Sequence, residues 1–351
     1  MSDPDGASPR AVIFGCAGTG LTDDEKGFFE RVRPFGLILF ARNVDTADRL
    51  RALTTEFREV VGRPDAPVLI DQEGGRVARL REPNWRHPPP AAVFVEAAKN
   101  DMNLGCRAAR LNYRMIARDL AAAGISVDCA PVLDIPVPGA HDIIGDRAFG
   151  HDAHTVATLG RSACDGLLDE AVLPVIKHMP GHGRATVDSH IGLPRVEATI
   201  EELQGSDFRP FNMLMDMPWA MTAHIVFAAI DPDRPATTST RVMREVVRGM
   251  IGYRGFVISD DVCMEALSGT PAERAEAALA AGCDSVLHCS GAFDEMQSIA
   301  AVTPRLTDEA QARIEHAETM RESRRGNAPA APGDMAAELR RLLSAAGFKA
   351  G

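Results

Sequence analysis

Several features are scarce or missing in this sequence, and each absence excludes a class of function. The chain has 351 residues and carries 38 Lys and Arg against 49 Asp and Glu, a formal charge of −11. It therefore lacks the basic excess that nucleic-acid phosphates require. No apolar run approaches the roughly 18 residues of a membrane span. The N-terminal MSDPDGASPR also lacks the apolar stretch of a secretory signal. We therefore expect a cytoplasmic protein with no nucleic-acid or membrane partner.

The cysteines form no CxxC pair. Seven of them are scattered between Cys16 and Cys289, mostly inside apolar runs such as SVDCAPVLDI. The odd number and the scatter favour reduced, buried thiols over a disulfide framework. Hydrophobic residues make up 45% of the chain and charged residues 25%, which is typical of a globular protein and excludes a fibrous or disordered one.

Eight short apolar runs recur along the chain, separated by segments with helical signals. The runs are nearly continuous in apolar residues, as strands covered on both faces are. They span 11–17, 36–41, 67–73, 125–134, 173–179, 219–225, 255–261 and 283–289. Helical patterns lie at 46–61, 108–124 and 272–282, and a capping box starts another helix at Thr22 and Glu25.

Eight β runs alternating with helices predict a parallel α/β protein, and their number favours a closed (β/α)8 TIM-type barrel. A doubly wound open sheet is the alternative, but GCAGTG at 15–20 lacks the last spaced glycine of a dinucleotide fingerprint. We expect a single catalytic barrel domain over residues 1–351. Within it, GNAPAAPG at 326–333 is typical of a linker, and 334–347 predicts a C-terminal helix on the barrel exterior.

Polar residues gather at the C-terminal ends of the predicted strands, where barrel active sites lie. They are Asp71, Glu73, Asp134, Lys177, His178, His224, Asp260, Asp261 and His288. A single charge there could be a cap or a rim residue, whereas several converging ends favour a functional site. His224 alone is more typical of a satisfied core histidine.

The two adjacent acids after the seventh run point to opposite faces of an extended chain. Phe256, Ile258 and Asp260 share one parity, which favours Asp260 as the residue that faces a substrate. A carboxylate there could be a nucleophile, a metal ligand or a general base. Asp261 is then expected to be structural.

The longest signal is the polar loop after the fifth run, within LPVIKHMPGHGRATVDSHIGLP at 173–194. Asp188 and His190 are two residues apart, close enough for the carboxylate to orient the imidazole as a general acid/base. The same pair could equally only tether the loop. Gly181 and Gly183 suggest a loop that moves and brings His190 in when substrate binds.

Two further segments carry arginines that suit recognition of hydroxyls. DQEGGRVARLR at 71–81 combines acids, glycines and arginines, and its alternative role is a surface ion-pair network. Arg147, in IGDRAFG, could bind hydroxyls or a carboxylate through its guanidinium fork. Its alternative is a bridge to Asp146 or Asp152.

These residues also carry a resemblance that spans residues 68 to 289. Its motifs are DQEGGRVARL, APVLDI, IGDRAFG, KHMPGHGRATVDSH, MTAHI, DPDRPATTS, GFVISDDVCMEAL and AGCDSVLHC. With them the chain resembles the bacterial β-N-acetylhexosaminidases of glycoside hydrolase family 3, the NagZ type. The resemblance implies a (β/α)8 barrel and a retaining enzyme that removes terminal β-linked N-acetylglucosamine from muropeptides in cell-wall recycling. It implies neither a metal nor an organic cofactor.

Residue by residue, the resemblance makes Asp260 the nucleophile of a covalent glycosyl-enzyme and His190, supported by Asp188, the acid/base. It assigns sugar binding to Asp71, Arg79, Arg147, Lys177 and His178. Two departures affect fine specificity rather than chemistry: Met179 stands where Phe is common, and Val262-Cys263 replaces the more usual Leu-Ser. The chain also lacks the second large domain of many family 3 β-glucosidases.

Three alternatives stay open on the sequence alone, and the oligomeric state is not indicated. One is a metal-dependent barrel hydrolase, with His178, His182, His224 and Asp260 as ligands. Another is a non-catalytic sugar-binding protein, which would have no need for Asp260 or the Asp188–His190 pair. The third is an N-acetylglucosaminide phosphorylase on the same site, because a neutral imidazole repels phosphate less than a carboxylate does.

Overall fold

The computed structural model describes residues 8–185, 192–327 and 333–346, and it confirms the predicted barrel. Eight parallel strands close into one sheet in the order β1-β12-β11-β9-β7-β6-β3-β2. They are β1 (Arg10–Phe14), β2 (Pro34–Leu39), β3 (Val68–Ile70), β6 (Val127–Asp128), β7 (Leu173–Met179), β9 (Trp219–Thr222), β11 (Phe256–Asp261) and β12 (Ser285–His288). Each strand overlaps one of the apolar runs, because a strand covered on both faces needs apolar residues at nearly every position, although β1 and β2 begin one and two residues before the predicted runs.

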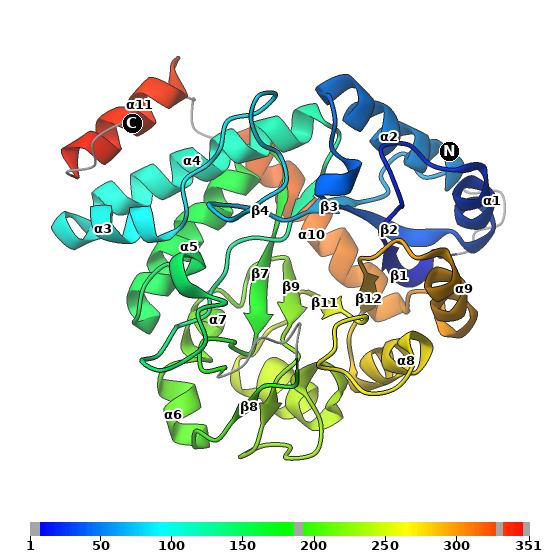
Figure 1. Ribbon diagram of the computed structural model, residues 1–351. Helices are drawn as coiled ribbons and strands as arrows, with labels where there is room; N and C mark the ends of the chain where they lie inside the picture. Colours follow the sequence, from blue (N-terminus) through cyan, green and yellow to red (C-terminus); the bar gives the residue numbers. More distant parts are fainter. Residues whose placement is uncertain (1–7, 186–191, 328–332, 347–351) are drawn as a thin grey trace.

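Helices cover the outside of the barrel (Figure 1). The α-helices are α1 (Asp23–Val32), α2 (Ala47–Val60), α3 (Ala92–Asn100), α4 (Met102–Ala122), α5 (Ala153–Leu168), α6 (Ile200–Gly205), α7 (Arg209–Met213), α8 (Pro271–Ala281), α9 (Phe293–Val302), α10 (Asp308–Asn327) and α11 (Met335–Ala345). Shorter or irregular turns are η1 (Ala41–Asn43), η2 (Gly145–Arg147), η3 (Ala236–Thr238) and the π-helix η4 (Val242–Met250). The predicted capping box of Thr22 and Glu25 starts α1.

Two small strand pairs lie outside the barrel sheet. β4 (Gln72–Gly74) and β5 (Val77–Ala78) form an antiparallel pair directly after β3, and β8 (Arg195–Val196) pairs in parallel with β10 (Val226–Phe227). The first pair places the predicted 71–81 segment beside the barrel mouth.

Side chains alternate between the barrel interior and the helix layer along each strand. Val175 and Ile258 belong to the interior cluster, whereas their neighbours Ile176 and Val257 pack with the outer helices. This alternation sends Asp260, which has the parity of Ile258, toward the interior. Asp260 does line the cavity at the strand ends, but so does Asp261, so parity alone does not separate the two acids.

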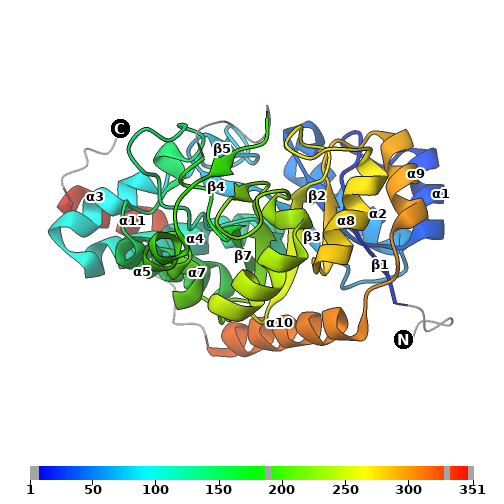
Figure 2. The same cartoon turned by 90° about the horizontal axis from the view of Figure 1, so that it is seen from below.

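The N-terminal end of the barrel is closed. Trp219, Phe35 and Phe256 contact one another, and the Trp219 ring centroid lies 5.6 Å from that of Phe35 and 4.7 Å from that of Phe256. Leu306 and residues of α10, including Ala310, join the same cluster, and α10 runs across this end (Figure 2). The C-terminal ends of the strands are therefore left to form the site.

The C-terminal segment differs in part from the sequence prediction. Helix α10 continues to Asn327, so the first two residues of the predicted linker 326–333 are helical, and residues 328–332 lie outside the described part of the chain. Helix α11 packs on α4, where Arg107 contacts Glu338 at 3.3 Å and Leu339 is buried. Among the helices described, none combines the length and apolar character needed to cross a bilayer.

Candidate active site

A cavity of about 380 Å³ opens at the C-terminal ends of the barrel strands. This volume is within the range of small-molecule sites. The predicted site residues that line it are Asp71, Arg79, Arg147, Lys177, His178 and Asp260. Its apolar walls come from Ile38, Phe40, Ile143, Ile144, Met221, Met264 and Leu287. Asp188 and His190 lie outside the described residues.

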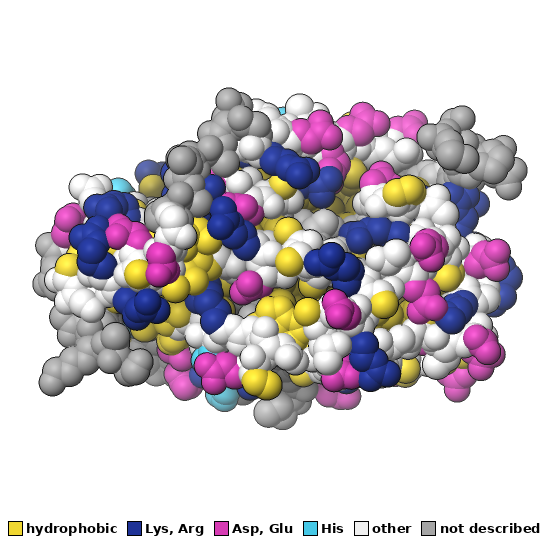
Figure 3. All heavy atoms as spheres, turned by 90° about the horizontal axis from the view of Figure 1, so that it is seen from above, with side chains coloured by type: hydrophobic (Ala, Val, Ile, Leu, Met, Phe, Trp, Pro, Cys, Tyr) yellow, Lys and Arg dark blue, Asp and Glu magenta, His cyan; other side chains and the backbone are white. Residues whose placement is uncertain are grey.

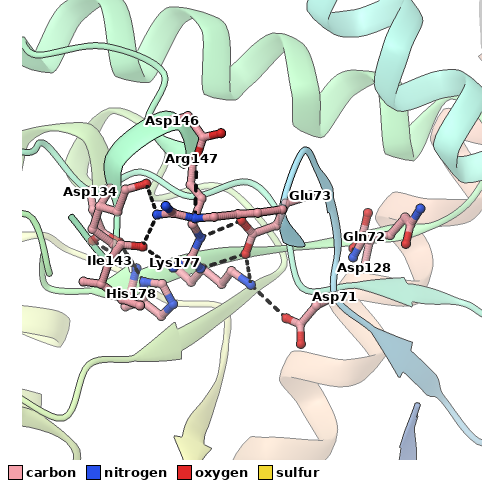
Figure 4. A network of polar contacts seen from close by, with 12 residues as sticks. Asp71, Gln72, Glu73, Asp128, Asp134, Ile143, Asp146, Arg147, Lys177 and His178 are labelled. Atoms are coloured by element: carbon pink, nitrogen blue, oxygen red, sulfur yellow. Dashed lines mark hydrogen bonds and ion pairs between the residues drawn. The ribbon is translucent and has the colours of Figure 1, made fainter. Parts of the chain in front are cut away.

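Lys177 is the centre of the charged network in this cavity (Figure 4). Its side chain is 2% exposed, and its Nζ atom lies 2.9 Å from Asp71 and 2.6 Å from Glu73. Burial alone would lower the pKa of this lysine, but the two carboxylates raise the pKa above its usual value. Lys177 is therefore a fixed cation, since a buried charge is tolerated when it is paired and hydrogen-bonded.

The carboxylates around Lys177 each bind a second cation. Arg79 donates to Asp71 at 3.0 Å, and Arg147 donates two bonds to Glu73, at 2.8 and 2.9 Å. Burial would raise the pKa of both acids, but the cations override it. They lower the pKa of Asp71 well below its usual range and that of Glu73 to about 2. The paired fork on Glu73 fixes the Arg147 plane.

This network corrects two alternatives considered for the sequence. The 71–81 acids are not a surface ion-pair network, because Asp71 and Glu73 turn inward onto Lys177. Arg147 pairs with Glu73 and bridges neither Asp146 nor Asp152, which caps α5 instead. Glu73 was noted in the sequence only as a strand-end acid. Its position two residues after Asp71 was the one signal that could have assigned it to the site.

Asp134 holds the end of β7 in place. His178 Nδ1 lies 2.7 Å from Asp134, and the backbone N–H groups of His178 and His182 donate to the same carboxylate. The register of β7 against β9 shifts between Ile176 and Met179. This irregularity lets the consecutive residues Lys177 and His178 both face the cavity, as strand bulges beside active sites commonly do.

Asp260 and Asp261 have different environments, as the sequence predicted. The Asp260 Oδ1 atom accepts from the Asp261 N–H at 2.8 Å. Asp261 Oδ1 accepts from the backbone N–H groups of Cys263 and Cys289, at 3.1 and 3.2 Å. Asp261 therefore fixes two loops to each other, while Asp260 holds its carboxylate at the cavity.

The charge state of Asp260 is set by neighbours at longer range. Burial would raise the pKa of this carboxyl, but His224 and His178 lower it, so the net pKa lies below its ordinary value. By contrast, burial raises the pKa of Asp261. Asp260 is thus ionised near neutral pH.

The histidines proposed as metal ligands are not assembled as a metal site in the described part of the chain. His224 uses both ring nitrogens, one with Thr237 at 2.7 Å and the other with the Asp261 carbonyl at 2.9 Å. Burial, followed by His178, lowers the pKa of His182 to about 4. His224 is therefore the core histidine that the sequence favoured.

Gly183 has a packing role that the sequence did not indicate. A Cβ atom at this position would lie 1.9 Å from the carbonyl oxygen of Ile135. Close backbone approach therefore requires a glycine here, and the predicted motion of the loop stays a prediction.

Comparisons with known proteins agree with this geometry. The family model described as "Glycosyl hydrolase family 3 N terminal domain" matches residues 26–320. The chain belongs to glycoside hydrolase family 3. It is thus a glycoside hydrolase, and the cavity at the strand ends is its candidate active site.

Individual relatives of this family 3 chain cover nearly its whole length. A "Beta-hexosaminidase" of Alkalilimnicola ehrlichii is 40% identical over 301 residues, which are 85% of this chain and 84% of the relative. One from Bordetella avium is 36% identical over 86% of this chain and 87% of its own. The crystal structure of NagZ from Neisseria gonorrhoeae in complex with N-trifluoroacetyl-D-glucosamine has a TM-score of 0.84 and 29% identity, covering 97% of this chain and 99% of NagZ.

Proposed function

We propose that this family 3 chain is a retaining exo-β-N-acetylglucosaminidase with Asp260 as its nucleophile. One observation carries the proposal. Among the described residues, the Asp260 carboxylate in the cavity lining contacts no cation and accepts one hydrogen bond, from the N–H group of its neighbour Asp261. The other lining acids, Asp71, Glu73 and Asp261, are each held by two partners. The relatives named "Beta-hexosaminidase" indicate a hexosamine, and the NagZ structure in complex with N-trifluoroacetyl-D-glucosamine supports N-acetylglucosamine as the sugar.

The proposed reaction has two steps. Asp260 attacks the anomeric carbon, and the bond to the leaving oxygen breaks as His190 protonates that oxygen. A glycosyl ester forms on Asp260. Water then attacks the same carbon and gives its proton to His190, which releases Asp260 and retains the configuration. Asp188 orients the imidazole and raises its basicity.

The network around Lys177 would bind the terminal sugar. Asp71, Lys177 and His178 present an acceptor, a cation and a ring nitrogen to the ring hydroxyls, with Arg79 and Arg147 at the edges. Because their partners already fix these groups, little ordering is needed when the sugar binds. We expect this preorganisation to act mainly on kcat/KM.

A small uncharged sugar suits this chain better than a polyanion. On the face shown in Figure 3, basic and acidic side chains are interspersed.

We infer that the natural substrates are muropeptides degraded in cell-wall recycling in the cytoplasm, which rests on the resemblance of the motifs. Rates on a muropeptide and on chitobiose test this, and a preference for chitobiose in kcat/KM would contradict it.

Charge balance also favours water over phosphate as the acceptor. Among the described lining residues, Lys177, Arg79 and Arg147 are already paired with Asp71 and Glu73, and Asp260 adds a negative charge. Arg76 also lines the cavity, but Asp142 at 3.7 Å and Asp146 at 3.5 Å compete for its guanidinium, so a phosphate dianion would find little free positive charge. Initial rates should therefore be equal in phosphate and non-phosphate buffers, and release of a sugar phosphate would overturn hydrolysis.

Retention and the absence of a metal requirement can be measured together. The chain should release p-nitrophenol from its N-acetyl-β-glucosaminide with and without EDTA. The first sugar seen by NMR should be the β-anomer. An α-anomer would contradict the covalent step, and inhibition by EDTA would revive the metal-dependent alternative.

Changing the leaving group of the substrate tests the assignment of His190 as the acid/base. p-Nitrophenolate departs with little protonation, whereas a sugar alcohol needs a full proton. His190→Ala should therefore slow hydrolysis of a disaccharide far more than the first step on the p-nitrophenyl substrate. Equal losses on both substrates would assign His190 to positioning instead.

A further inference from the structure

A second cluster of chemically active side chains lies next to residues that line the sugar site. The geometry points to a binding site for a thiophilic divalent cation such as Zn²⁺, formed by Cys263, His288 and Glu295. This inference is independent of the hydrolysis reaction, because none of these residues is among those assigned to the sugar. In the described part of the chain it is the one group of three or more such side chains with ligand spacing.

Three separate elements bring these residues together. Cys263 follows β11, His288 is the last residue of β12, and Glu295 lies in the first turn of α9. Their three ligand atoms lie within 4.8 Å of one another. Cys263 Sγ is 3.5 Å and His288 Nε2 is 3.0 Å from the same oxygen, Glu295 Oε2.

These separations are close to those of a tetrahedral zinc site. Bonds of about 2.0–2.3 Å from zinc to N, O and S place neighbouring ligand atoms about 3.3–3.7 Å apart. Modest side-chain shifts would therefore admit the ion. Ser290 Oγ lies 2.8 Å from Glu295 and 3.0 Å from His288. It can therefore hydrogen-bond a water molecule that fills the fourth coordination position of the ion.

The donor set matches the chemistry of zinc rather than magnesium. One sulfur, one imidazole nitrogen and one carboxylate oxygen suit a borderline-soft ion, whereas magnesium prefers oxygen alone. On binding, Cys263 would lose its thiol proton to solvent and form the metal–sulfur bond. The proton now between His288 Nε2 and Glu295 would move to His288 Nδ1 or to solvent.

The surroundings indicate only moderate affinity. His288 is fully buried, and its Nδ1 atom has no hydrogen-bond partner in the described structure. Ligating histidines usually donate from the second nitrogen to an acceptor, and losing such a partner weakens binding about 10–100-fold. Three protein ligands and a bare second nitrogen therefore predict exchangeable zinc rather than a permanent structural ion.

The site shares its backbone with the sugar cavity. Asp261 accepts from the N–H groups of Cys263 and Cys289, so the residue after Asp260 is hydrogen-bonded to both loops that carry the cluster. A cation bound by Cys263 would thus be linked to the proposed nucleophile through this loop, without contacting the residues assigned to the sugar.

Cobalt titration of the metal-free, full-length protein tests the site. Co²⁺ bound by a thiolate gives a sulfur-to-metal charge-transfer band, and Zn²⁺ should displace it. We expect one equivalent in the wild type and none in Cys263→Ser. Cys106→Ser, which changes a partly exposed thiol on α4, is the matched control and should keep the band.

Two further variants distinguish metal binding at Cys263 from metal binding in the sugar cavity. Asp260→Asn should keep the band, and losing it there would place the metal in the sugar cavity. Glu295→Gln changes a side chain that is 39% exposed, so folding is not at risk, and it should weaken cobalt binding about tenfold or more. No band in the wild type, or a band that persists in Cys263→Ser, would overturn the proposal.

Discussion

The carboxylates on the two sides of the cavity are held in different ways. On the β3–β7 side, Asp71 and Glu73 each contact two cations, at 2.6–3.0 Å. On the β11 side, Asp260 has one hydrogen bond in the described structure, from the N–H of its neighbour. The first arrangement fixes groups that recognise a sugar, and the second keeps an acid free to react.

The difference lies in how each anion is stabilised. Lys177 neutralises Asp71 and Glu73 by direct contact. The pKa of Asp260 lies below its ordinary value although the residue is buried, because His224 and His178 lower it without direct contact. A nucleophile needs an uncompensated charge on an accessible oxygen, and of these three acids only Asp260 has no cation in direct contact among the described residues.

The largest expected effect comes from the two adjacent acids of β11. Asp260→Ala should lower kcat by about 10⁴-fold or more, as removal of a nucleophile does. Asp261→Asn should keep activity within about tenfold, because an amide oxygen can still accept from Cys263 and Cys289. Steady-state kinetics on the p-nitrophenyl substrate decide the matter, and equal losses would abolish the distinction between the two acids.

The next effect concerns the stability of the network on the other side. Lys177→Met would leave Asp71 and Glu73 facing each other in a buried site, and it should cost about 3–5 kcal/mol of unfolding free energy. Lys99→Met removes an exposed lysine paired with Glu96 and should change stability by less than about 1 kcal/mol. Urea unfolding measures both. Similar values for the two variants would show that the Lys177 network is not preorganised.

A smaller effect is expected from the backbone that leads toward Asp188. Gly183→Ala places a methyl group 1.9 Å from the Ile135 carbonyl and should destabilise by about 1–3 kcal/mol. A Cβ at Gly192 meets no atom of the described residues within 4 Å, so Gly192→Ala should change stability by about 0.5 kcal/mol or less. Thermal unfolding of both variants tests this, and an unchanged Gly183→Ala would restore loop motion as the reason for this glycine.

The smallest effect is a pH dependence. The folded-state pKa of Glu73 is about 2, below its unfolded value, so its contribution to stability is present above about pH 4.3 and is lost as the pH falls toward 2. Each such group contributes a slope of up to about 1.4 kcal/mol per pH unit. In Glu73→Gln, the free energy of unfolding, measured with urea between about pH 4.5 and 3, should depend less steeply on pH than in the wild type. An unchanged slope would mean that Glu73 is not held by Arg147 and Lys177.

The barrel was predictable because every strand carries its own signal. Each strand overlaps a nearly continuous apolar run with polar residues near its C-terminal end, so Lys177 and Asp260 could be placed from local sequence. The partners of Arg147 were not predictable, because Glu73 reaches it from a segment 74 residues away. The same holds for Cys263, His288 and Glu295, which lie on three elements and show no spacing motif.

Trapping the glycosyl-enzyme tests the central claim most directly. A fluorinated N-acetylglucosaminyl fluoride, whose ester intermediate hydrolyses slowly, should label the protein once. Mass spectrometry of the digested protein should then place the sugar on Asp260. A label on another residue, or none in an enzyme that turns over the p-nitrophenyl substrate with retention, would contradict Asp260 as the nucleophile.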